Sequence, residues 1–244
     1  MVEQTPDSGG HRGRTPAAAV WPHRSLLGVL PPPIREELLR AGTGVSFGPG
    51  DVLLSEGARD RHVFLLMSGF VKVTATLENG QESLLSVRVG GDMVGEMAAV
   101  DGAPRSATVT ACGPLAARVF QPAMMADLMA RRPEVAMALT RSVSEQLRWA
   151  NRRRLDFGGY SAKVRLARLL VELAEVYGRP EPHGVVVGCR LTQPEIATLT
   201  GAAETTIHKA LRELRELGLL ETGYRSTVIR DLPRLRQVGE LIDG

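Results

Sequence analysis

The most informative part of the chain reads Gly95-Glu96-Met97-Ala98-Ala99-Val100-Asp101-Gly102-Ala103-Pro104-Arg105-Ser106-Ala107-Thr108. A glycine opens a short helical turn, and the exposed backbone N–H groups at such a start can cradle an anion. Arg105 then supplies a planar fork that suits bidentate binding of phosphate, and Ser106 adds a hydroxyl donor. Glu96 would repel a phosphate, so we expect it to bind another group, such as a ribose hydroxyl. The segment therefore predicts a site for an anionic ligand.

This segment lies within a region that reads as β-structure. Between Gly44 and Gln121, short runs rich in Val, Leu, Thr and Phe alternate with glycine turns. The predicted strands are Val52–Leu54, Val63–Met67, Phe70–Leu77, Leu84–Val89, Ala107–Ala111 and Ala116–Phe120. Asn79-Gly80 is a strong hairpin signal because both residues tolerate a positive φ. Many short strands with frequent turns predict a β-sandwich or roll.

The periodicity becomes helical after this region, and a long helix is predicted from Pro133 to about Leu155. Its apolar positions are four and three residues apart, which places them in a seam on one face: Val143, Leu147 and Ala150. Gly158-Gly159 should break the helix and mark a domain boundary. We interpret 133–157 as a dimerisation helix.

A second strong motif follows in residues 191–214. Thr192 and Glu195 form the pattern of a capping box, which starts a helix. Gly201 should end this helix at a tight turn, and a second helix begins at Ala203. The buried stripe of that second helix is predicted to be Ile207, Leu211 and Leu214. A short helix, a glycine turn and a second amphipathic helix are typical of a helix-turn-helix.

The polar residues of this motif are suited to contact DNA. The residues predicted to reach base edges or phosphates are Thr192, Glu204, Thr205, Thr206, His208 and Lys209. After Gly218, the segments Leu219–Thr222 and Thr227–Arg230 read as a hairpin wing. Arg225 at its tip is placed to contact backbone phosphate.

Both motifs resemble those of the CRP/FNR family of transcription regulators. Residues 95–108 closely resemble the phosphate-binding cassette of cyclic-nucleotide-binding domains. The resemblance implies that Glu96 takes the ribose 2′-OH, and that Arg105 and Ser106 hold the cyclic phosphate. It also implies that Gly95 and Met97 offer backbone N–H groups. Because a buried Arg105–Glu96 pair would be costly to keep without a ligand, the pair favours ligand binding.

The identity of the nucleotide base stays open. In cAMP-responsive members of the family, the long helix supplies a hydroxyl pair that reads the adenine amino group. Ala150 and Asn151 fall at these positions here. Ala150 cannot form a hydrogen bond, whereas the amide of Asn151 can both donate and accept. Base specificity therefore stays open, so cGMP or another nucleotide is an alternative to cAMP. The effector is predicted to be cAMP or cGMP, with no further cofactor.

The resemblance extends from about residue 25 onward and implies an α+β fold. We predict a disordered tail over 1–24 and a jelly-roll-like β-roll of the cyclic-nucleotide-binding type over 25–132. The dimerisation helix over 133–157 and a winged helix-turn-helix DNA-binding domain over 158–244 follow.

The implied function is that of a homodimeric regulator that binds a palindromic DNA operator and is gated by a cyclic nucleotide. The alternatives are a ligand-independent regulator of this type, one that senses a different small molecule, and a nucleotide-sensing regulatory subunit of an enzyme. Residues 191–230 argue against the last. Glu204-Thr205 stands where the cAMP-receptor pattern has arginine and then glutamate. Because glutamate prefers a cytosine amino group, we do not expect the usual family operator.

Composition supports these expectations. The net charge is only +3, so DNA binding must depend on local placement of cations. The separation of Cys112 and Cys189 suggests neither a disulfide nor an iron–sulfur cluster, and it fits a reducing cytoplasm. We expect no metal site, no catalytic centre, no membrane span and no signal sequence. Residues 178–184 lie where relatives contact RNA polymerase, but their sequence does not specify that partner.

Overall fold

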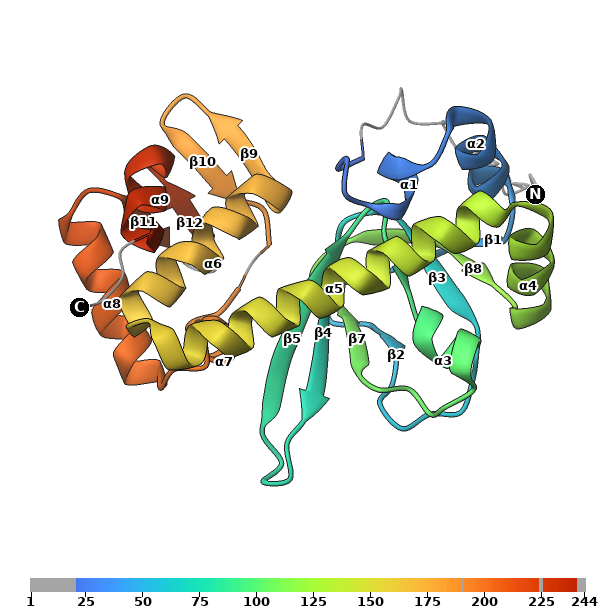
Figure 1. The fold of residues 1–244 in the computed structure, drawn as a ribbon, viewed down its shortest axis with the longest axis horizontal. Helices are drawn as coiled ribbons and strands as arrows, with labels where there is room; N and C mark the ends of the chain where they lie inside the picture. Colours follow the sequence, from blue (N-terminus) through green and yellow to red (C-terminus); the bar gives the residue numbers. More distant parts are fainter. Residues whose placement is uncertain (1–20, 190, 224–225, 241–244) are drawn as a thin grey trace, which may run out of the picture.

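A computed structural model describes residues 21–189, 191–223 and 226–240. It contains a β-rich N-terminal unit, a long helix and a C-terminal unit of helices and short strands (Figure 1). Residues 1–20 of the predicted tail lie outside the described residues. The tail prediction was wrong for 21–24, because Trp21 is half-buried and packs against the apolar cluster that contains Leu26 and Phe120.

Two antiparallel sheets form the described N-terminal unit. Their strand orders are β1-β8-β3-β6 and β2-β7-β4-β5. The strands are β1 (Thr43–Phe47), β2 (Val52–Leu54), β3 (Val63–Ser68), β4 (Phe70–Thr76), β5 (Glu82–Val89), β6 (Met93–Val94), β7 (Thr108–Ala111) and β8 (Leu115–Phe120). Phe64 and Leu66 of one sheet share a core with Val71 and Val109 of the other, which holds the sheets together.

The hairpin signal at Asn79-Gly80 is confirmed. Gly80 has a φ of +81°, and β4 pairs with β5 up to Thr76 opposite Glu82. The N–H of Leu77 donates to the carbonyl of Gln81 at 2.8 Å and closes the turn. This hairpin joins the two longest strands of its sheet, β4 and β5 (Figure 1).

Short helices surround this unit. They are α1 (Leu26–Val29), α2 (Pro32–Arg40), α3 (Glu96–Asp101) and α4 (Pro122–Arg131). Of these, α3 connects β6 to β7 and carries the first half of the predicted anion-binding segment. The fully buried Leu38 and Phe120 and the 2% exposed Leu128 join α2, β8 and α4 in one cluster.

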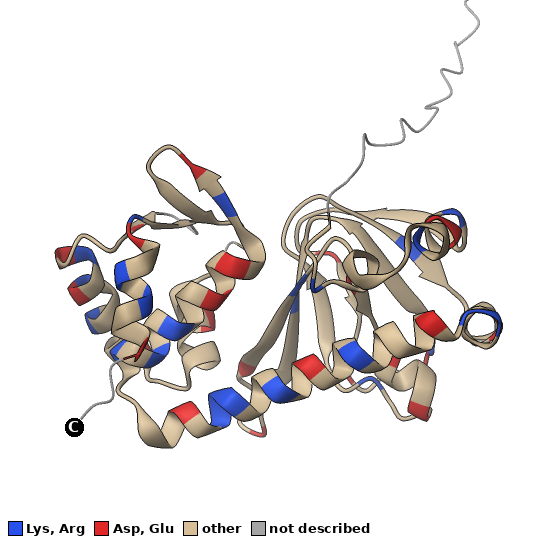
Figure 2. Ribbon diagram, turned by 45° about the horizontal axis from the view of Figure 1, so that its top comes forward, with Lys and Arg blue, Asp and Glu red and all other residues tan. Residues whose placement is uncertain are grey.

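The long helix α5 (Pro133–Gly159) runs from the N-terminal unit to the C-terminal unit (Figure 1). The prediction that Gly158-Gly159 breaks the helix was wrong, because both glycines are helical and Tyr160 is the C-cap. A glycine costs only about 1 kcal/mol in a helix, which the preceding turns can offset. Arginines are interspersed with Asp and Glu along α5 (Figure 2).

The C-terminal unit combines helices with a small sheet of order β11-β12-β10-β9. Its elements are α6 (Ala162–Tyr177), β9 (Gly178–Glu181), β10 (Gly184–Val187), α7 (Gln193–Thr200), α8 (Glu204–Glu216), β11 (Leu220–Gly223), β12 (Ser226–Ile229) and α9 (Leu232–Glu240). Ile207, Leu211 and Leu214 are buried in its core, as predicted. Neither α9 nor β9 was predicted from the sequence.

The C-terminal unit packs directly on β5. Leu84 and Val87 of β5 belong to the same apolar core as α6, α7 and α8. The Thr198 hydroxyl accepts the N–H of Leu84 at 3.1 Å, and Lys72 of β4 pairs with Glu195 of α7 at 2.5 Å. The predicted α+β class and its order of β-roll, long helix and winged helix-turn-helix are thus confirmed. None of the described helices is both long and apolar enough to cross a membrane.

Candidate effector and DNA-binding sites

The predicted anion-binding segment lines a cavity of about 380 Å³. The predicted residues that line it are Gly95, Glu96, Met97, Arg105 and Ser106. Strands β2, β4, β5, β6 and β7 add mostly apolar walls, and α5 closes one side with Val143, Gln146, Leu147, Trp149 and Ala150. The cavity therefore combines a few polar groups with mostly apolar walls, an arrangement typical of small-molecule sites.

Glycine is required at position 95. Gly95 is the N-cap of α3 with a φ of +88°, a conformation that disfavours side chains. A Cβ there would lie 2.7 Å from Arg105 Nη1 and 2.9 Å from Leu54 Cδ1. The absence of a side chain lets Arg105 reach the carbonyl of Gly95 at 2.8 Å.

Arg105 is buried and strongly bonded, with only 2% of its side chain exposed. Its Nε donates to Asp60 at 2.8 Å, its Nη1 donates to Gly95, and its Nη2 donates to both Asp60 and the carbonyl of His62. A guanidinium has five N–H donors. The bonds to described residues use four of them, which leaves one Nη1 N–H for a ligand.

The prediction that Arg105 pairs with Glu96 was wrong. Asp60 is the acidic partner of Arg105, whereas Glu96 is half-buried and lines the cavity. Asp60 precedes β3 and is 45 residues from Arg105, so no local pattern indicated the pairing. The buried guanidinium is therefore balanced in the protein alone, and Glu96 remains available to another group.

The other predicted ligand residues do not all line the cavity. Met97 is 48% exposed, and the Ser106 hydroxyl is 3.9 Å from its sulfur. Asn151 is exposed on α5 and is not among the residues that line this cavity. Gln146, which the sequence interpretation missed, is the amide of α5 that does line it. Its position, four residues before Ala150, is the signal that could have identified it.

The start of the helix-turn-helix is built as predicted. Thr192 is the N-cap of α7, with its hydroxyl 3.4 Å from the N–H of Glu195. The Glu195 carboxylate accepts the N–H of Thr192 at 2.7 Å and completes the capping box. Gly201 has a φ of +61° and ends α7. These contacts fix the turn from which α8 begins.

The start of α8 presents polar side chains to solvent. The exposed predicted residues are Glu204, Thr205, Thr206, His208 and Lys209. His208 Nε2 lies 3.4 Å from a Glu204 carboxylate oxygen, one turn away on the same face. Arg225 lies outside the described residues, between β11 and β12. The described residues therefore give an exposed polar helix start beside a hairpin.

Comparison with known proteins agrees with this two-part arrangement. A cyclic nucleotide-binding domain model matches residues 44–132, and a Crp-like helix-turn-helix domain model matches residues 164–238. The CRP-like cAMP-activated global transcriptional regulator of Mycobacterium tuberculosis is 31% identical over 191 residues, which cover 78% of this chain and 85% of that protein. Transcriptional regulator SdrP of Thermus thermophilus is 30% identical over 204 residues, covering 80% and 94%.

The structure of FixK2 from Bradyrhizobium japonicum has the same fold. It superposes with a TM-score of 0.70 at 20% identity and covers 83% of this chain and 100% of FixK2. The matched domains and relatives are those of transcriptional regulators and not of enzymes. The chain belongs to the CRP/FNR family of transcriptional regulators.

Proposed function

We propose that the protein is a homodimeric DNA-binding regulator whose affinity for its operator is set by cAMP or cGMP bound in the β-roll. The observation that supports this most strongly is the cavity that joins Gly95, Glu96, Arg105 and Ser106 to the long helix α5. A ligand there touches both the anion-binding segment and the helix that leads to the DNA-binding unit.

In this proposal the cyclic phosphate lies beside Arg105 and Ser106 in the cavity. It accepts the remaining Nη1 N–H of Arg105, the hydroxyl of Ser106, and the backbone N–H groups of Gly95 and Met97. Glu96 accepts a hydrogen bond from the ribose 2′-OH. The base packs against the apolar walls, and Asn151, exposed on α5, reads it in the cavity of the partner subunit.

Dimerisation uses the apolar seam of α5, which contains Val143, Leu147 and Ala150. Val143 is 38% exposed and Leu147 61% exposed in the single chain. Pairing these residues with a second copy buries them, as in a coiled coil. Two recognition helices then lie about 34 Å apart, one turn of DNA, on a palindromic site.

DNA contact is assigned to the start of α8, which enters the major groove. Glu204 accepts from a cytosine amino group, while Thr205, Thr206, His208 and Lys209 contact neighbouring bases or phosphates. Thr192 and Arg225 contact the backbone and fix the register. The β9–β10 hairpin occupies the position proposed for an RNA polymerase contact.

Ligand and DNA are coupled if the nucleotide has different affinities for two arrangements of the dimer. Coupling free energies of this kind are typically about 1–3 kcal/mol, which corresponds to roughly 5- to 150-fold in DNA affinity. The nucleotide would shift the pair of α5 helices and thereby re-aim both recognition helices.

Calorimetric titration with cAMP and then cGMP tests the ligand. We expect one of them to bind the wild-type protein, and Arg105→Ala to abolish that binding. Operator selection with and without the bound nucleotide then tests the coupling. Absence of binding by both nucleotides, with DNA binding intact, would instead support a ligand-independent regulator or one that senses another molecule.

A further inference from the structure

Arg153 of α5 lies between two sites. One is the cavity lined by Gly95, Glu96, Arg105 and Ser106, called the effector cavity below, and the other is the helix-turn-helix. Arg153 follows the cavity-lining Ala150 by three residues, which is about 4.5 Å along a helix axis. Its guanidinium stacks on the ring of Trp149 at 4.4 Å, and its Nη1 is 3.3 Å from the carbonyl of Leu85 on β5. Both Trp149 and Leu85 line the effector cavity. One side of Arg153 therefore contacts two walls of the ligand site.

The other side of Arg153 contacts the end of α7. Its Nη2 donates to the carbonyl of Leu199 and lies 3.3 Å from the carbonyl of Thr198. The last carbonyls of a helix lack partners within the helix and carry partial negative charge. A cation placed there satisfies them and stabilises the helix end, so Arg153 holds α7 at the turn that precedes α8.

Arg153 is also held in a low-polarity environment. Burial lowers its pKa to about 10, so the guanidinium stays charged at neutral pH. Among the described residues, no carboxylate lies within ion-pair distance of it, unlike Arg152, which pairs with Glu172 at 3.8 Å. Backbone carbonyls and the Trp149 ring are thus the main partners of Arg153. The positions of these groups determine the position of its guanidinium.

A neighbouring contact makes the junction tight. A Cβ on Gly201, in the turn after α7, would overlap the ring of Phe157 on α5. The last turns of α5 and the helix-turn-helix turn are therefore in direct van der Waals contact. Small displacements of α5 are transmitted across such close packing because it has little free volume to absorb them.

We infer that Arg153 is the positioning residue that transmits occupancy of the effector cavity to the recognition helix. A ligand that shifts Leu85 or Trp149 moves the guanidinium, and the guanidinium moves the carbonyl end of α7. This inference rests on the proposed cyclic-nucleotide gating. It goes beyond that gating by assigning the coupling to one side chain.

The test compares Arg153→Met with Arg153→Lys and with the control Arg152→Met. Methionine keeps much of the length of the side chain but removes every donor and the charge, whereas lysine keeps the charge and one of the carbonyl contacts. Arg152 is the adjacent, 61% exposed arginine. For each variant, calorimetry with cAMP and cGMP gives ligand affinity, and DNA affinity is measured with and without saturating nucleotide.

We expect Arg153→Met to bind the nucleotide within about twofold of wild type, while the ratio of DNA affinities with and without nucleotide falls from roughly 5- to 150-fold to near one. Arg153→Lys should recover part of this ratio, and Arg152→Met should keep all of it. A purely structural role would lower the melting temperature and both DNA affinities but leave their ratio unchanged, and that result would overturn the inference. If neither nucleotide changes the DNA affinity of the wild-type protein, the proposed gating and this inference are both wrong.

Discussion

The carboxyl group of Asp92 lies in a site that disfavours its charge. Asp92 directly precedes β6, and its Oδ2 accepts the N–H of Val89 at 3.1 Å. Burial raises its pKa from 3.8 to about 6, although nearby Arg88 opposes the change. Because the folded-state pKa is raised, the stability that Asp92 contributes is fully present below pH 3.8 and is lost as pH rises through about 6.

Asp92→Asn should therefore stabilise the protein at alkaline pH. The amide oxygen can still accept the N–H of Val89, while the charge of the half-buried carboxylate is gone. We expect the free energy of unfolding to rise by up to about 3 kcal/mol near pH 8, and the gain to disappear near pH 4. Urea denaturation at both pH values, at one protein concentration, measures this. The exposed Asp101 also accepts a backbone N–H, from Ala103, so an equal pH dependence in Asp101→Asn would contradict the role of burial.

Glu204 carries the predicted difference in operator choice. It is exposed on the first turn of α8, where a side chain can reach base edges. Glu204→Arg should change the preferred base at one position of each half-site from cytosine to guanine, with discrimination of about 1–3 kcal/mol. Selection from random duplexes reads this directly. Glu216→Arg makes the same charge change at the far end of α8, and a matching change in base preference there would exclude direct readout by Glu204.

The sequence could not predict the contacts of residues whose partners are distant in the chain. Local spacing was enough to predict that Gly95, Arg105 and Ser106 lie together, and all three line one cavity, because a segment at a helix start is contiguous in the chain. Asp60 and Arg153 were missed because their partners, Arg105 and Leu199, are 45 and 46 residues away. Their roles follow from tertiary packing, which a periodic pattern does not encode.

At the scale of elements, the turn between α7 and α8 depends on a glycine with two separate constraints. Gly201 has a positive φ of +61°, and its missing Cβ leaves room for the ring of Phe157. Gly218 has a similar φ of +70°, but a Cβ at that position would meet no described atom within 4 Å. A comparison of substitutions at Gly201 and Gly218 therefore separates the cost of backbone strain from the cost of steric overlap.

Gly201→Ala should destabilise the C-terminal unit more than Gly218→Ala does. The left-handed conformation costs either variant about 1–2 kcal/mol. Overlap with Phe157 adds to this cost only at position 201, so DNA affinity should also fall only there. Denaturation and DNA titration of both variants measure the difference. Equal losses in the two variants would mean that the Phe157 contact contributes little.

Elements with strong local signals were predictable, and those fixed by pairing were not. The hairpin at Asn79-Gly80 and the capping box of α7 rest on residues close together in sequence. β9 has the sequence Gly178-Arg179-Pro180-Glu181, which has poor strand propensity, and its strand geometry comes from pairing with β10. β6 has only two residues, too few for any periodicity, and is defined by its pairing with β3.

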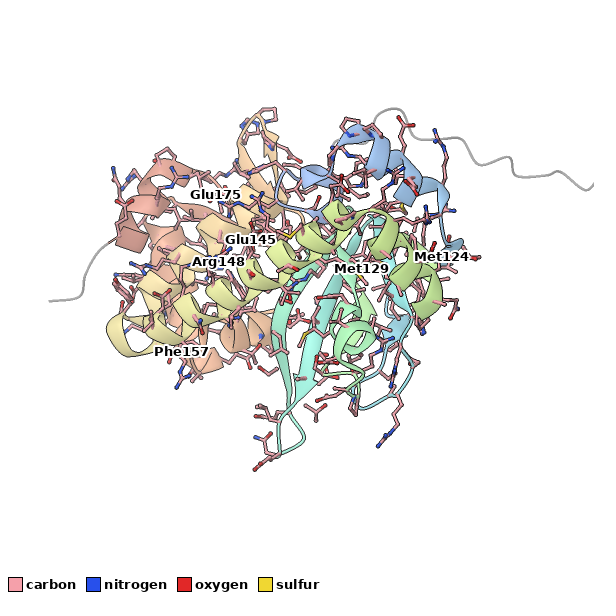
Figure 3. The ribbon with its side chains drawn as sticks, turned by 45° about the vertical axis from the view of Figure 1, so that its right-hand side comes forward. Met124, Met129, Glu145, Arg148, Phe157 and Glu175 are labelled. Carbon is pink, nitrogen blue, oxygen red and sulfur yellow. The ribbon has the colours of Figure 1, made fainter. Side chains whose placement is uncertain are left out.

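At the scale of the whole molecule, α5 has three different tasks along its length. Its first turns pack on the β-rich unit through the buried Val135, Ala138 and Leu139. Its middle lines the cavity that we propose binds the effector, and its last turns contact the turn between α7 and α8. In Figure 3, Glu145 and Arg148 mark the polar side of α5. The apolar seam lies on a different side and is what we assign to the partner subunit.

Leu147→Glu should convert the proposed dimer to a monomer. Leu147 is 61% exposed in the single chain, and in the proposed dimer its replacement would bury a carboxylate against a copy of itself. We expect the dissociation constant of the dimer to rise by at least about 30-fold, as for a central interface residue. Affinity for a palindromic operator should then fall to that of a half-site, because the advantage of two linked contacts is lost. Sedimentation equilibrium and titration with full and half operators measure both effects.

Arg148→Glu is the control variant. It places a new carboxylate on the adjacent residue but on the polar side of α5, so this variant should remain dimeric. If both variants dimerise equally well, the seam is not the interface, and the two recognition helices must be paired by another surface.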